Sequence, residues 1–322
     1  MTEPAWPGCL GEAMRRFVEH KRALNRKYLA EERALRLFGK YLDQQAVSGW
    51  QQVDSSLIER FLRSRERSRP RSFNHLLGVL RQFFSWAVSQ RLTDTNPATC
   101  RPQPVTSRRI PYLFGLSEMR ALLAAARQLP DNSRAKWRGL VYETVFALLC
   151  GLGLRVGEVT RLRLADADFE SSVITVRETK FGKSRFVPMG PKLAARLADY
   201  VEAVHSTDPD PQAPLFSFTP GRPMHPGTIS QTFHALLPTL DLPARRGVET
   251  PRAHGLRHSF AVATLLRWYR EGVNPQSRLL HLSTFMGHVS PSSTAVYLTI
   301  TEELLAEADK RFRDYARPGG EA

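Results

Sequence analysis

A group of residues near the C-terminal end of the sequence could cleave a phosphodiester. His254 and Arg257 stand three positions apart, Gly287-His288 follows them, and Tyr297 comes nine positions after His288. Arginine binds phosphate oxygens through two parallel N–H bonds, and histidine exchanges protons near neutral pH. A tyrosine hydroxyl becomes a covalent nucleophile when its proton is shared or removed. This spacing therefore indicates a tyrosine nucleophile surrounded by phosphate-binding groups.

Two cations earlier in the chain could complete such a site. Arg155 lies in Gly153-Leu-Arg155-Val-Gly-Glu158, just past an apolar stretch, and Lys180 lies between two β-rich segments. Each residue also has an ordinary explanation. Arg155 could be a surface residue or the ion-pair partner of Glu158, Lys180 a solvated turn lysine, and Tyr297 a core tyrosine. Whether these residues form one active site therefore depends on the elements that position them.

Length and charge favour two domains and a polyanionic partner. The 322 residues are 42% hydrophobic and 24% charged, with a net charge of +15, which allows a packed core. Residues 1–112 hold 20 Lys and Arg against 10 Asp and Glu, whereas the remainder holds 26 against 21. A basic surface can simply favour solubility. An arginine-rich excess concentrated in one segment instead favours nucleic acid.

Several classes of site are disfavoured by composition. Cys9, Cys100 and Cys150 are far apart and odd in number, so neither a disulfide framework nor a zinc site is indicated, and a reducing cytoplasm is expected. No signal peptide or membrane-spanning run is recognisable. No cluster of Asp and Glu suggests a metal site. We expect no metal, no nucleotide cofactor and no membrane contact.

The first domain is expected to span residues 1–96 and to be a compact four-helix unit with basic edges. Apolar residues recur at helical spacing over 9–45, 55–62 and 72–90. Ser48-Gly49 ends the first of these segments, and Asp54 or Ser55 could cap the next helix. A basic loop then precedes Pro70, and its arginines are candidate DNA contacts: Arg63, Arg65, Arg67, Arg69 and Arg71.

A linker is expected at residues 97–112. Four prolines and no apolar periodicity mark this stretch, and proline stiffens a linker. Arg108 and Arg109 are candidate DNA contacts within it, although a passive spacer is an equally good explanation for any single arginine there.

The second domain is expected to span residues 113–322. Helices are predicted from Ser117, over 135–150, from Pro191, over 226–237 and from His254 onward. The β-rich segments Val173–Val176 and Arg185–Val187 predict a hairpin, and a short strand is expected at 215–218. The predicted fold class is α+β: mainly helical, with a small antiparallel sheet.

Taken together and in this order, these motifs resemble the tyrosine recombinase (phage integrase, Xer-like) family. The matching pieces, all as they stand in the sequence, are Gly153-Leu-Arg155-Val-Gly-Glu158, the hairpin containing Lys180, His254-Gly-Leu-Arg257-His258, Met286-Gly-His288 and Tyr297. The resemblance covers residues 112–300. It extends to 9–92 as a helical, basic domain in the place of the family's SAM-like core-binding domain.

The resemblance implies a role for each matching residue. Tyr297 would attack a DNA phosphate to leave a 3′-phosphotyrosine, while Arg155, Arg257 and His288 hold the non-bridging oxygens. Lys180 would protonate the leaving 5′-oxygen, and His254 would accept from or order the tyrosine hydroxyl. Lys183 stands three residues after Lys180 and is expected to contact DNA, because the family places the catalytic lysine at the first position.

The resemblance also implies partners and a location. The expected partner is duplex DNA with inverted-repeat half-sites, bound by a homotetramer. A helix at Glu302–Tyr315 would couple the active sites of the four protomers. In solution the protein could be a monomer. That helix carries Leu304, Leu305, Ala308 and Phe312 along one stripe, which could equally pack on its own core. A bacterial cytoplasm and association with the nucleoid are expected.

Three alternatives stay open beside integration and excision of a mobile element. They are Xer-like resolution of replicon dimers, nicking and closing like a type IB topoisomerase, and DNA binding without catalysis. One departure from the family concerns spacing, since Arg257 and His288 are 31 positions apart, a few more than is common. We expect the extra residues in a loop at 271–282, and this favours a mobile-element enzyme.

Overall fold

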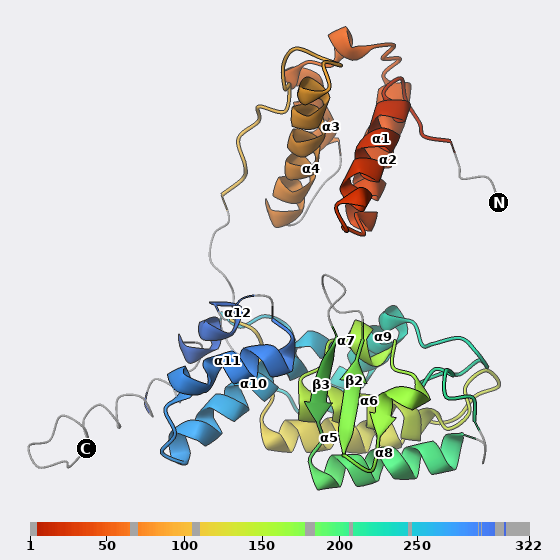
Figure 1. Ribbon diagram of the computed structural model, residues 1–322, viewed down its shortest axis with the longest axis vertical. Coiled ribbons are helices and arrows are strands. Elements are labelled where there is room, and N and C mark those ends of the chain that lie inside the picture. Colours follow the sequence, from red (N-terminus) through yellow and green to blue (C-terminus); the bar gives the residue numbers. More distant parts are fainter. Residues whose placement is uncertain are drawn as a thin grey trace, which may run out of the picture. The chain divides into compact units, whose positions relative to one another are not determined.

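The computed structural model divides the chain into two compact units, Met1–Arg108 and Arg109–Ala322 (Figure 1). The structure describes residues 5–64, 70–104, 110–177, 184–205, 209–243, 247–288, 290, 292–299 and 306. Each unit has its own hydrophobic core, as expected of domains that fold around separate centres.

The first unit is helical throughout its described secondary structure. Its elements are α1 (Gly11–Ala23), α2 (Leu29–Gln44), the 3₁₀ turn η1 (Trp50–Gln52), α3 (Ser55–Arg63) and α4 (Pro70–Ser89). The segment predicted as helical at 9–45 forms two helices, because Asn25 and Tyr28 adopt left-handed backbone angles between them. Asp54 begins α3 as expected, since its side chain accepts the Leu57 N–H at 2.7 Å.

Aromatic side chains fill the centre of this unit. One buried phenylalanine or more comes from each helix: Phe17, Phe38, Phe61, Phe83 and Phe84. Phe38 and Phe61 have ring centroids 5.0 Å apart, as do Phe83 and Phe84. Burial of one such ring stabilises a fold by roughly 1.5–3 kcal/mol, so the aromatic contacts between helices hold this small unit together.

The first part of the expected linker is attached to α4. Asn74 donates to the Gln103 carbonyl at 2.8 Å and accepts the Gln103 N–H at 2.7 Å. Arg81 donates to the carbonyls of Ala98 at 3.0 Å and Cys100 at 2.5 Å. Residues 98–103 therefore extend the first unit and are not a free spacer.

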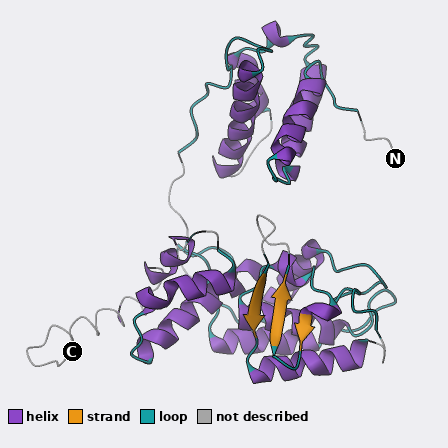
Figure 2. Ribbon diagram, in the orientation of Figure 1, coloured by secondary structure: helices purple, strands orange, loops and turns teal. Residues whose placement is uncertain are grey.

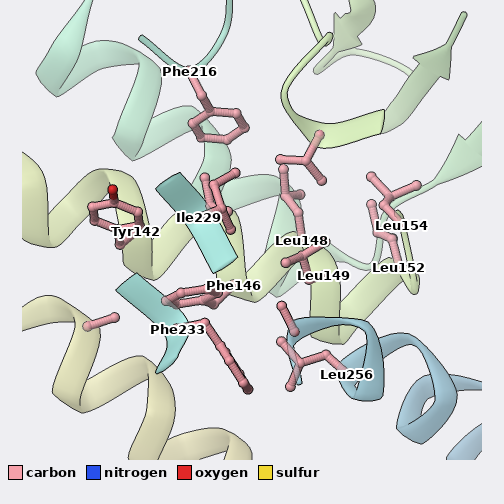
Figure 3. Packing of buried hydrophobic residues seen from close by; sticks show 14 of the residues in the cluster. Tyr142, Phe146, Leu148, Leu149, Leu152, Leu154, Phe216, Ile229, Phe233 and Leu256 are labelled. Carbon is pink, nitrogen blue, oxygen red and sulfur yellow. The ribbon is translucent and has the colours of Figure 1, made fainter. Parts of the chain in front are cut away.

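The second unit is built around a central apolar helix, α6 (Arg138–Leu152). Around it lie α5 (Leu116–Arg127), α8 (Pro191–Val204), α9 (Pro226–Leu236) and α10 (Ala253–Arg270). Figure 3 shows how Phe146 of α6 meets Phe233 of α9, with Leu256 of α10 close to the same helix. The helix α6 is buried on nearly all sides. This packing holds its C-terminal end in place, and the chain runs from that end directly to Arg155.

A small antiparallel sheet lies beside these helices. The strands β1 (Ala167–Asp168), β2 (Val173–Val176) and β3 (Arg185–Pro188) pair in that order (Figure 2). The predicted hairpin is confirmed. The strand predicted at 215–218 is wrong: Leu215 and Phe216 are buried there but make irregular contacts with Leu162 and Met224, and a short apolar run alone does not identify a strand.

Several of the remaining elements of this unit lie at the site. They are α7 (Val156–Val159), α11 (Pro275–Met286), α12 (Ser292–Ala295) and η5 (Val296–Thr299), with further 3₁₀ turns η2 (Leu164–Asp166) and η4 (Leu237–Thr239). The loop expected at 271–282 is much shorter, because Asn274 caps α11 by accepting the Gln276 N–H. The α+β fold class is confirmed (Figure 2).

Candidate active site

Arg155 is held at the turn between α6 and α7. Gly153 ends α6 with a φ of 58°, and a Cβ there would lie 2.5 Å from the Phe260 ring, so only glycine fits. The Arg155 N–H donates to Glu158 at 3.0 Å, while its guanidinium donates to Glu158 at 2.7 Å and to the Gly287 carbonyl at 3.0 Å. The possible pairing with Glu158 is confirmed.

Glu158 also binds a second arginine, which the sequence reasoning missed. Both Glu158 carboxylate oxygens accept from Arg185 of β3, at 3.1 and 2.9 Å, and Arg185 also donates to the Phe285 carbonyl at 2.8 Å. Burial alone would raise the pKa of Glu158. The hydrogen bonds and charge of Arg185, with the N–H and guanidinium of Arg155, outweigh it and lower the pKa to about 2. The carboxylate thus fixes both arginines.

Arg257 is buried on α10, with 2% of its surface exposed. Its two terminal nitrogens donate to the carbonyls of Gly153 at 2.5 Å and Met286 at 2.6 Å. Burial, followed by the nearby charge of Arg155, lowers its pKa to about 10, so it stays charged at neutral pH. A guanidinium has five N–H donors, and these two contacts leave others for a phosphate.

His288 follows Gly287, the left-handed residue that ends α11. Its Nδ1 lies 2.6 Å from the Thr294 hydroxyl of α12. Burial first, and then the charges of Arg257 and Arg155, lower its pKa to about 4. A neutral imidazole whose Nδ1 accepts from Thr294 carries its proton on Nε2, the atom that can donate to an anion.

Tyr297 lies in η5, 4% exposed, within an apolar cluster formed with α10 and α11. Its hydroxyl is 2.7 Å from Nδ1 of His258, and its ring stacks on that of His288 with centroids 6.3 Å apart. Burial raises the pKa of Tyr297, while Arg257 and Arg155 act in the opposite direction. The hydroxyl is therefore protonated and placed beside the arginines.

The histidine that contacts Tyr297 differs from the one expected. His254 was expected to accept from or order the hydroxyl, but the hydroxyl's partner is His258. The His254 ring meets the His258 ring edge-on, with centroids 4.7 Å apart. Packing of protein around its ring, followed by the charges of Arg257 and Arg155, lowers the pKa of His254. The two residues lie one turn apart on α10, so His254 stands next to the contact.

Several predicted residues lie outside the described part of the chain. They are Lys180, Lys183, Arg65, Arg67, Arg69, Arg108 and Arg109, together with the expected tail helix at 302–315 apart from position 306. Of the remaining candidate DNA contacts, Arg63 pairs with Glu59 and is 76% exposed, and Arg71 is exposed near the start of α4. Both belong to the first unit.

Within the described residues, no three His, Cys, Asp or Glu side chains gather closely enough to hold a metal ion. In the same part of the chain, no helix is both long and apolar enough to cross a membrane.

Two family models match the chain. The model described as "Phage integrase family" matches residues 116–303, and "Phage integrase, N-terminal SAM-like domain" matches residues 27–91. Among curated relatives, the chain is 35% identical to a putative integrase/recombinase, y4rB, of Sinorhizobium fredii, over 93% of this chain and 96% of the relative. It is 30% identical to the tyrosine recombinase XerD of Xanthomonas campestris, over 81% of this chain and 78% of the relative.

Solved structures of the same fold exist. The Tn1549 transposon integrase, solved in complex with transposon right end DNA, has a TM-score of 0.65 at 19% identity, over 95% of this chain and 99% of that chain. A lambda integrase dimer bound to a COC′ core site has a TM-score of 0.61 at 17% identity, over 89% of this chain and 76% of that chain. These likenesses confirm the fold.

Proposed function

Since this chain belongs to the phage integrase family of tyrosine recombinases, we propose that it cuts and rejoins duplex DNA through a 3′-phosphotyrosine on Tyr297. One observation carries the assignment of residues. Four separate elements of one unit bring Arg155, Arg257, His288 and Tyr297 to one place, as a nucleophile beside phosphate-binding donors requires.

The two arginines would bind the non-bridging oxygens of the scissile phosphate. Negative charge grows on these oxygens as the pentacoordinate transition state forms, and donors already fixed in place stabilise that charge most. Glu158 fixes Arg155, while two backbone carbonyls fix Arg257. By analogy with other oxyanion-binding groups, each such donor contributes about 2.7–4 kcal/mol.

His288 and Lys180 would complete the reaction. His288, neutral and held by Thr294, would donate a third hydrogen bond to the phosphate. Lys180 would protonate the leaving 5′-oxygen as a general acid. The phosphotyrosine keeps the energy of the broken bond, so a 5′-hydroxyl from a second strand can displace Tyr297 without a nucleotide cofactor.

The DNA would be a duplex bound by both units. The excess of arginine in residues 1–112 and the exposed Arg63 and Arg71 suit phosphate contacts, which makes the affinity strongly dependent on salt. We further propose a homotetramer assembled on two inverted-repeat sites and coupled by the tail at Glu302–Tyr315, in a nucleoid-associated protein.

Integration and excision of a mobile element is the proposed biological role. The 35% identity to a putative integrase/recombinase over nearly the whole chain supports it. Resolution of replicon dimers is the second candidate, supported by the 30% identity to a XerD tyrosine recombinase.

The test is a DNA duplex with a nick close to the cleavage position, which lets the cleaved fragment diffuse away and traps the intermediate. The wild-type chain should form a covalent protein–DNA adduct, and Tyr297→Phe should form none. The absence of a wild-type adduct would refute the proposal. Product that requires two cognate sites would identify a recombinase, and relaxation of one supercoiled duplex without such sites would identify a topoisomerase-like activity.

A further inference from the structure

The Tyr297 hydroxyl already has a proton acceptor in the folded chain. Nδ1 of His258 lies 2.7 Å from the hydroxyl oxygen, within the range at which a base and a nucleophile share a proton. The ring centroids of the two residues are 5.5 Å apart. No other hydrogen bond to this hydroxyl is present among the described residues.

The direction of this hydrogen bond follows from burial. Tyr297 is 4% exposed, so its O–H proton needs a protein acceptor. A neutral imidazole offers one acceptor nitrogen and one N–H. If Nδ1 donated instead, the tyrosine proton would point into the apolar cluster without a partner. The favoured arrangement therefore has the His258 proton on Nε2, while Nδ1 accepts from Tyr297.

The position of His258 is fixed by its helix. Ala261 and Leu265 follow it on α10 at helical spacing, are fully buried and belong to the cluster that holds Tyr297. The edge-on contact with His254 covers another side of the ring. The residue thus meets the usual requirement for a catalytic base, which is a ring held in one orientation against the nucleophile.

We propose that His258, and not His254, receives the proton of Tyr297 during DNA cleavage. This inference rests on the function proposed above. As the bond from the tyrosine oxygen to phosphorus forms, the bond from phosphorus to O5′ breaks, and the hydroxyl proton moves to Nδ1 of His258. The leaving oxygen takes its proton from a separate acid, Lys180 in the proposal. Ligation reverses each of these transfers.

The electrostatics set the timing of this transfer. Burial first, then His254 and Arg257, lower the pKa of His258 to about 4, whereas burial raises that of Tyr297. Transfer before attack is therefore unfavourable. It becomes favourable as the oxygen bonds to phosphorus, because the phenolic oxygen then loses electron density. The negative phosphodiester also offsets the positive charges near His258.

The experiment compares single-turnover adduct formation by the full chain on the nicked duplex. His258→Ala removes the base, and His258→Asn keeps an oxygen near the Nδ1 position that can accept a hydrogen bond but takes no proton. His281→Asn is the matched control, since His281 is exposed on α11. Loss of a general base slows a reaction by about 10²–10⁴-fold, so both His258 variants should slow by that factor while DNA affinity and the control are unchanged.

Added imidazole separates a proton acceptor from a structural residue. It should restore part of the rate of His258→Ala and none of the rate of His254→Ala. The inference is overturned if His258→Ala cleaves within about threefold of wild type, if His258→Asn regains the wild-type rate, or if imidazole rescues the His254 variant instead. A wild-type chain that forms no adduct overturns the proposed function itself, which is a different result.

Discussion

Replacing Glu158 with glutamine should both destabilise the second unit and disable its active site. The carboxylate is 3% exposed and accepts from Arg155 and Arg185 at once. Glutamine keeps the size but not the charge, and its amide N–H₂ would face one of the two guanidinium groups. The variant therefore leaves buried positive charge without its counter-ion.

The lowered pKa of Glu158 gives the size of the expected loss of stability. A fall from 4.5 to about 2 at 1.36 kcal/mol per unit corresponds to about 3 kcal/mol in favour of the charged form, within the range of about 3–5 kcal/mol for breaking a buried pair. A unit of this size loses about 2–4 °C in Tm per kcal/mol. The Tm of the second unit's transition should therefore fall by roughly 6–12 °C at pH 7.

The pH dependence gives this prediction a second test. A carboxyl group whose folded pKa is depressed stabilises the fold above its unfolded pKa, and this stabilisation is lost as the pH falls toward the folded value. The difference between wild type and Glu158→Gln should be complete above about pH 5 and should shrink from pH 4.5 toward pH 2.

Calorimetry of both proteins across this pH range, with adduct formation at pH 7, is the assay. Glu202→Gln is the control, because Glu202 is exposed on α8 and should change the stability by less than about 0.5 kcal/mol. If Glu158→Gln melts within 2 °C of wild type at pH 7 and still cleaves DNA, Glu158 does not hold the arginines as described.

Gly153→Ala should destabilise the second unit by about 2–5 kcal/mol in chemical denaturation, because the left-handed backbone and the contact with Phe260 both oppose a Cβ; an unchanged midpoint would contradict this. Arg257→Lys should slow adduct formation at least about 10²-fold in single-turnover assays, since an ammonium group cannot span the carbonyls of Gly153 and Met286; near-normal cleavage would exclude the role given to Arg257. EDTA should leave the cleavage rate unchanged, because arginines supply the positive charge that a metal would provide, and loss of cleavage on chelation would reveal a metal requirement.

Local spacing predicted several main elements of both units. The apolar residues of α4, α6 and α10 recur at helical intervals, and the β-branched run Val173–Val176 predicted the hairpin. In each case the local pattern and the final packing agree. The break between α1 and α2 depends on left-handed residues at 25 and 28, and apolar spacing alone does not place its exact position.

Contacts between distant elements were harder to predict. Arg185 shares the inward face of β3 with the buried Val187, and this two-residue alternation could have indicated that it points toward the core. Its partner Glu158 lies 27 residues away, and no local pattern connects the two. Likewise, His258 shares a helical stripe with Ala261 and Leu265, but the packing of η5 against that stripe decides which histidine meets Tyr297.

The identity of the residue joined to DNA tests the proposed cleavage chemistry directly. The trapped adduct can be digested with nuclease and trypsin, and the modified peptide sequenced by mass spectrometry. The tryptic peptide 279–310 contains a single tyrosine, Tyr297. The nucleotide should be attached there through a 3′-phosphate. Attachment to any other residue, or through a 5′-phosphate, would contradict it.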